Sequence, residues 1–126
     1  NEAAISLCDV VKKKGSEFTY IYDYGDDWQH RLKVEKANVP YDRRYGPLYC
    51  LEGKGSCPPE DVGGVPGFEE FCKAMANKKH PSHEEYCDWY GEGTYERDRF
   101  DAAEVNLSLL MYLRWSRERV LPWARE

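Results

Sequence analysis

The length, composition and charge of the chain exclude several classes of protein. Its 126 residues, 41% hydrophobic and 14% aromatic, suffice for one domain with a core of its own. The formal net charge of −5 argues against non-specific coating of nucleic acid, because that function requires a basic surface. No apolar run approaches the roughly 20 residues of a membrane-spanning helix, so no membrane partner is expected. Five cysteines cannot all pair within one chain, which favours reduced thiols and a cytoplasmic location.

A β-hairpin is the firmest element that the pattern predicts. A short helix is expected first, over Glu2–Lys14, with Gly15 as its stop. Residues 18–24 and 28–35 then alternate between apolar and polar side chains on either side of the loop Gly25–Asp27. A period of two is typical of half-buried strands, so the two segments predict an antiparallel hairpin with one apolar and one charged face.

A long loop and three helices are predicted for the rest of the chain. Residues 38–66 contain five of the seven prolines, which predicts an ordered, turn-rich loop. Helices are expected from Pro66, from either Pro81 or a capping box at Ser82 and Glu85, and from Asp101. Residues 114–126 would extend the last helix with Arg and Trp side chains. The predicted fold is a single α+β domain over residues 1–126, in which three to four short helices cover one face of the hairpin.

Two motifs connect the chain with a known family. Residues 22–30 read YDYGDDWQH, and residues 57–68 read CPPEDVGGVPGF. In this order they resemble the plasmid pRiA ORF-three-like family, whose members lie beside mobile elements and in many prokaryotic genomes. The resemblance runs roughly from Glu17 to Leu109 and implies no particular chemistry. Further elements that carry it are Tyr20, Cys50, His80-Pro81, Trp89, Phe100-Asp101 and Asn106.

The chain departs from the pattern of that family in two ways. Val62 stands where members often have a further Cys, which weakens any metal site built from thiols of the loop. Members also usually begin with a strand and a helix that precede the region seen here. The chain therefore resembles the C-terminal two-thirds of the domain, and we expect the free edge of the hairpin to be completed by a segment or chain outside residues 1–126.

An acidic turn is the first candidate site. The hairpin brings carboxylates of the turn close to an imidazole, and the loop motif can add two more acidic side chains. Such a set could bind a divalent metal or act in acid/base catalysis. Alternatively, Asp26 or Asp27 caps backbone amides of its own turn, and the His lies in the apolar face. The motif of residues 57–68 would then pack onto the hairpin, and its acidic residues would cap backbone amides as well. The candidate binding residues are Asp23, Asp26, Asp27, Trp28, His30, Glu60 and Asp61.

The thiols and the remaining histidines give weaker signals. Cys50 and Cys57 lie seven residues apart and could hold zinc or form a local disulfide, although free thiols are the favoured interpretation. His80, His83 and Cys87 have ligand-like spacing, but a solvated helix start accounts for them more simply.

Arginines and tryptophans near the C-terminus form the last candidate site. Side chains of this kind can bind phosphates and stack on bases, whereas a solvated helix end is the alternative. The candidate contacts to nucleic acid are Arg114, Trp115, Arg117 and Arg119.

No triad, phosphate loop or dinucleotide fingerprint is present in the sequence. The favoured hypothesis is a small non-catalytic module that binds a protein or a nucleic acid, with self-association through the hairpin edge as one form of binding. The alternative is a metal-dependent hydrolase or nuclease that uses the acidic turn and the Glu60-Asp61 loop. Zinc or another divalent metal would then be its cofactor.

Overall fold

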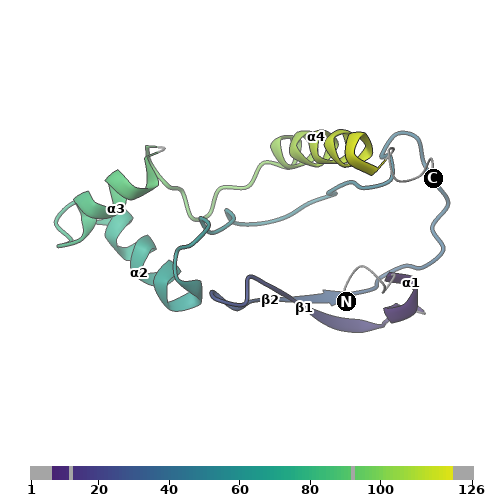
Figure 1. Ribbon diagram of the computed structural model, residues 1–126, viewed down its shortest axis with the longest axis horizontal. Coiled ribbons are helices and arrows are strands. Elements are labelled where there is room, and N and C mark those ends of the chain that lie inside the picture. Colours follow the sequence, from purple (N-terminus) through teal and green to yellow (C-terminus); the bar gives the residue numbers. More distant parts are fainter. Residues whose placement is uncertain (1–6, 12, 92, 121–126) are drawn as a thin grey trace. The chain divides into compact units, whose positions relative to one another are not determined.

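The computed structural model describes residues 7–11, 13–91 and 93–120. The chain divides into two compact units whose segments alternate along the sequence. Unit 1 comprises Asn1–Val39 and Pro58–Tyr95, and unit 2 comprises Pro40–Cys57 and Glu96–Glu126. A two-stranded antiparallel sheet and several helices are present (Figure 1), which confirms the predicted α+β class.

Unit 1 begins with the predicted hairpin. Strand β1 (Glu17–Tyr22) pairs with strand β2 (Trp28–Lys33), so that Tyr20 lies opposite His30. Helix α1 (Leu7–Val10) precedes the hairpin. It ends at Val10, earlier than the helix expected over Glu2–Lys14, of which residues 2–6 and 12 lie outside the described residues.

The hairpin is less covered than the sequence suggests. Phe18 and Trp28 are half-buried, and the other strand residues are exposed. Trp28 meets the ring of Phe68 edge-on, with ring centroids 6.2 Å apart. The described residues of unit 1 therefore cover the hairpin at Phe18 and at Trp28, and the aromatic side chains of β1 between these positions remain exposed.

The core of unit 1 is aromatic and lies between helices α2 (Gly64–Ala76) and α3 (His83–Tyr90). Phe71 and Ala74 are fully buried there. The ring of Phe71 is surrounded by aromatic rings at centroid distances of 5.0 to 5.9 Å. Aromatic side chains thus provide most of this core, as the composition suggests. The neighbouring rings are those of Tyr86, Trp89, Tyr90 and Tyr95.

The start of α3 differs from the prediction. Ser82 precedes the helix, but its side chain makes no capping hydrogen bond, so the capping box with Glu85 is wrong. The amide of Ser82 instead donates to His80 Nδ1, at 3.2 Å. At the other end, Gly91 adopts a φ of 68° and its amide donates to Cys87 O, which is a common way to end a helix.

Unit 2 combines the segment Pro40–Cys57 with helix α4 (Ala102–Val120). Asp101 Oδ1 accepts hydrogen bonds from the amides of Ala103 and Glu104 at 2.9 and 3.3 Å, so the predicted helix start is confirmed. Asn106 holds the segment against the helix, because its side chain accepts from Cys50 N at 2.7 Å and donates to Cys50 O at 2.9 Å. Among the described residues, no helix is long and apolar enough to cross a membrane.

Candidate functional site

The turn between β1 and β2 is held by its own first aspartate. Asp23 Oδ1 accepts hydrogen bonds from the amides of Gly25 and Asp26, at 3.0 and 3.4 Å. Asp23 and Asp27 both have positive φ values, 56° and 54°, and aspartate tolerates this region better than most residues. The acidic composition of the turn therefore follows from its backbone conformation.

The motif of residues 58–68 packs onto this turn, as predicted. Asp26 Oδ2 accepts a hydrogen bond from the amide of Gly63 at 3.1 Å. The two oxygens of Glu60 accept from the hydroxyl of Tyr22 at 3.0 and 3.1 Å. The expectation that Asp26 or Asp27 caps its own turn is wrong, because Asp23 does so and Asp26 bonds the loop instead.

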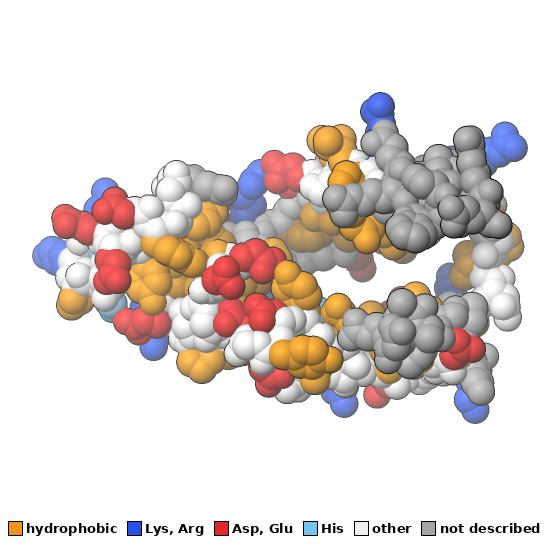
Figure 2. Space-filling model, viewed as in Figure 1, with side chains coloured by type: hydrophobic (Ala, Val, Ile, Leu, Met, Phe, Trp, Pro, Cys, Tyr) orange, Lys and Arg blue, Asp and Glu red, His pale blue; other side chains and the backbone are white. Residues whose placement is uncertain are grey.

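The hydrogen bond to Glu60 changes the titration of Tyr22. A carboxylate that accepts the phenolic proton stabilises the protonated form, and its negative charge opposes ionisation. The pKa of Tyr22 is therefore raised above its ordinary value near 10.0. Figure 2 shows acidic side chains gathered in the part of the molecule where the hairpin turn lies.

The remaining candidates near the turn do not converge on a common point. His30 is exposed, its ring lies 6.0 Å from that of Tyr20, and its Nδ1 lies 3.1 Å from Trp28 O. Asp27 accepts from the side chain of Gln29 at 3.1 Å, and Asp61 is exposed. Among the described residues, no three His, Cys, Asp or Glu side chains form a group that could hold a metal ion. The carboxylates that the structure brings together therefore contact amides and a hydroxyl.

The two cysteines of the loop, Cys50 and Cys57, are not joined by the disulfide that was one of the predicted alternatives. The thiol of Cys50 lies 3.5 Å from Glu52 O, within reach of a weak S–H hydrogen bond. A zinc site at this pair remains a prediction.

The Arg/Trp segment belongs to α4, whose bounds extend to Val120. Trp115 and Arg114 line a hollow of about 560 Å³ on this helix with Leu107, Leu110 and Met111. The side chains of Arg117 and Arg119 lie outside the described residues, as does the whole of segment 121–126. A nucleic-acid contact here also stays a prediction.

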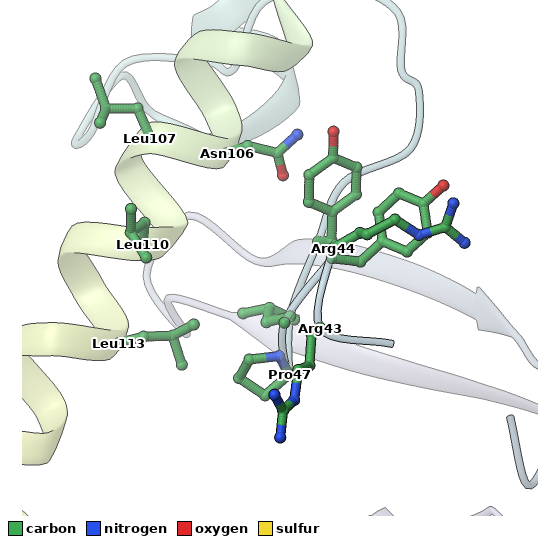
Figure 3. A pocket seen from close by; sticks show the side chains of 11 residues that line it. Arg43, Arg44, Pro47, Asn106, Leu107, Leu110 and Leu113 are labelled. Carbon is green, nitrogen blue, oxygen red and sulfur yellow. The ribbon is translucent and has the colours of Figure 1, made fainter. Parts of the chain in front are cut away.

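A pocket of about 440 Å³ in unit 2 was not anticipated from the sequence. It lies between residues 43–49 and α4, and in Figure 3 Leu113 points towards Pro47 whereas Arg44 is directed away from the helix. The guanidinium of Arg44 is bound to Asp42 at 2.7 Å, which holds the pKa of Asp42 below its ordinary value. Leu107, Leu110 and Leu113 line the pocket from α4, and their spacing of three residues is the sequence signal that could have indicated this surface.

Comparisons with known proteins agree with the motifs. The chain is 42% identical to uncharacterized protein y4hQ of Sinorhizobium fredii over 107 residues, which cover 84% of this chain and 52% of the relative. The crystal structure of MM3350 from Methanosarcina mazei Go1, a protein of unknown function, has a similar fold, with a TM-score of 0.70 and 31% identity. That similarity covers 82% of this chain and 57% of the other. The chain thus spans about half the length of the relatives that it matches.

The family comparison extends further than the motifs did. The family described as plasmid pRiA4b ORF-3-like protein matches residues 1–106, and so begins before Glu17, where the resemblance of the motifs starts. The interpretation that the chain is the C-terminal two-thirds of the domain is not confirmed. The chain belongs to the plasmid pRiA4b ORF-3-like family.

Proposed function

We propose that the chain is a small, non-catalytic binding module, and that it binds an extended polypeptide along the outer edge of β1. Within the described residues, β1 pairs with β2 alone. In an antiparallel pair, the backbone groups of alternate residues point away from the partner strand. The hydrogen bond from Val34 N to Ser16 O implies that Glu17, Thr19 and Ile21 direct these groups outwards. A row of such groups can pair with an added strand.

The composition of the two strands favours β1 over β2 as the binding edge. Strand β2 carries Arg31 and Lys33, and charged side chains of this kind commonly protect an edge strand against pairing. Strand β1 has the sequence EFTYIY, whose one charged residue is Glu17. Along this strand, Tyr20 and Tyr22 are 48% and 44% exposed. An added strand would cover part of this aromatic surface, which gives the binding an apolar contribution.

The hydrogen bonds of the acidic residues are the reason for proposing a binding function and not a catalytic one. Asp23 and Asp26 accept hydrogen bonds from amides, and Glu60 accepts one from a hydroxyl. These contacts support a structural role for the acidic residues, which leaves the surface of the hairpin as the functional feature.

The edge can be tested with peptides selected against the purified chain from a random-peptide display library. We expect selected peptides to protect the amides of Thr19 and Ile21 from hydrogen exchange. Thr19→Pro should abolish binding, because proline has no amide to donate. Arg31→Pro is the matched control, since Arg31 lies opposite Thr19 on the other edge of the hairpin. Circular dichroism of both variants checks that the hairpin still forms.

Other results would replace the proposal. Equal loss of binding in Thr19→Pro and Arg31→Pro, with both variants folded, would place the contact elsewhere. Phosphodiester cleavage that requires a divalent metal and is lost in Asp26→Asn and His30→Ala would support a hydrolase or nuclease. Salt-dependent binding of single-stranded DNA that is lost in Trp115→Ala would support a nucleic-acid partner at α4.

A further inference from the structure

Three soft or borderline donor atoms meet where α2 packs against α3. The thiol of Cys87 on α3 lies 3.5 Å from Nε2 of His83, one helical turn earlier. The same sulfur lies 3.9 Å from the thioether sulfur of Met75 on α2. All three side chains are half-buried, so the cluster is shielded yet remains accessible from solvent. In Figure 1 the two helices lie next to each other, and they are joined by a short connection.

A hydrogen bond fixes the orientation of the His83 ring. Its Nδ1 lies 2.7 Å from the carbonyl oxygen of Ala74, a fully buried residue of α2. A carbonyl oxygen can only accept, so Nδ1 carries the proton and Nε2 presents its lone pair towards Cys87. Metal-binding histidines usually donate their other ring N–H to a carbonyl or carboxylate in this way. The ring is therefore oriented as a ligand before any ion binds.

We propose that Met75 Sδ, His83 Nε2 and Cys87 Sγ form a three-donor site for monovalent copper. Thiolate and thioether ligands select soft ions such as Cu(I), whereas structural zinc sites take four ligands and do not use thioethers. Three donors at metal–ligand distances of about 2.0–2.3 Å around a trigonal ion lie roughly 3.5–4.0 Å from one another. The two observed separations, 3.5 and 3.9 Å, already have this spacing.

Binding of the ion requires no change of oxidation state. Cu(I) would replace the proton of the Cys87 thiol, which is released to solvent, and no oxidant or reductant takes part. The helical spacing of His83 and Cys87 was visible in the sequence, but two donors do not make a site. The third donor, Met75, lies twelve residues from Cys87 and reaches it only through the packing of α2 on α3.

Competition for Cu(I) against a chromophoric chelator tests the site. The reduced protein is titrated without oxygen, and the variants are Met75→Leu, His83→Gln and Cys87→Ser. We expect one equivalent of tightly bound Cu(I), at least a hundredfold loss of affinity in Cys87→Ser, and at least a tenfold loss in the other two. Met111→Leu is the matched control, because it removes an exposed thioether elsewhere and should leave the affinity unchanged.

A second measurement does not depend on any variant being folded. One equivalent of Cu(I) should protect Cys87 of the unmodified chain from alkylation by iodoacetamide, as mapped by mass spectrometry, and X-ray absorption should show two sulfur ligands and one nitrogen ligand. The proposal is overturned if Cys87 is not protected, if Met75→Leu binds Cu(I) as tightly as the unmodified chain, or if Zn(II) binds more tightly than Cu(I).

Discussion

Replacing Gly64 by alanine should separate the loop from the hairpin turn. Gly64 is the first residue of α2 and has a φ of 67°, in the region that disfavours a side chain. A Cβ built at this position would collide with the carbonyl oxygen of Asp26. Neither partner can yield cheaply, because the obstacle is backbone and Asp26 is tied to the loop through the amide of Gly63.

Gly63→Ala is the control, because it separates the cost of a positive φ from the cost of the collision in Gly64→Ala. Gly63 also has a positive φ, 95°, but a Cβ there would meet its nearest atom, Gly67 Cα, at an ordinary 3.5 Å. The conformational strain alone should lower the free energy of unfolding by about 1–2 kcal/mol in Gly63→Ala. In Gly64→Ala the collision adds a further 1–3 kcal/mol or so, the usual cost of overpacking. We therefore expect a total loss of roughly 2–5 kcal/mol.

Urea unfolding monitored by tryptophan fluorescence measures the difference. Trp28 is a suitable reporter, because it lies in the hairpin and packs against Phe68 of α2. Equal midpoints for Gly63→Ala and Gly64→Ala would refute the reasoning, since they would show that the Asp26 carbonyl does not lie against Gly64 in solution.

Three further predictions concern single contacts. The hydrogen bond of Tyr22 raises its pKa, so the bond stabilises the fold fully below the ordinary tyrosine pKa near 10.0. This stabilisation is lost as the pH rises through the raised pKa of Tyr22. Ultraviolet titration should show that Glu60→Gln lowers the pKa of Tyr22. Asn106→Ala removes both bonds to the backbone of Cys50 and should cost about 1–3 kcal/mol in urea unfolding, so an unchanged midpoint contradicts the role assigned to it. Phe71→Ala empties a fully buried position and should cost about 3–5 kcal/mol by the same assay, and a loss below 1 kcal/mol would show that the core lies elsewhere.

The elements that depend on local sequence were predictable. The hairpin follows from a period of two and an acidic Gly-containing turn. Its observed strands start within one residue of the predicted alternation and end two residues before it does. The start of α4 follows from Asp101, whose side chain reaches amides two and three residues later. Val105, Leu109 and Leu113 recur every four residues, which is typical of one face of a helix, and all three are half-buried. In each case the physical cause lies within a few residues of its effect.

Contacts across large sequence separations were not predictable. Asn106 and Cys50 are 56 residues apart, and Tyr22 and Glu60 are 38 apart. The long loop is divided between the units after Cys57, because its first part bonds to residues of unit 2 and its second part to the hairpin turn. Composition indicated that this segment contains turns, but it could not indicate which distant residues satisfy the backbone. These partners explain how a segment with little regular structure stays ordered.

The hydrogen-bond partners of Asp26 and Glu60 argue against a metal ion at the acidic turn. A cation that takes Asp26 as a ligand must compete with the amide of Gly63, which donates to Oδ2 of this half-buried side chain. A hydrogen bond to a charged group is worth about 1.5–3 kcal/mol, and its loss would also release the loop from the turn. A cation that takes Glu60 as a ligand must likewise compete with the hydroxyl of Tyr22, because both oxygens of Glu60 accept from it. Metal binding at this turn would therefore oppose the packing that positions the carboxylates, whereas strand addition along β1 leaves every one of these contacts intact.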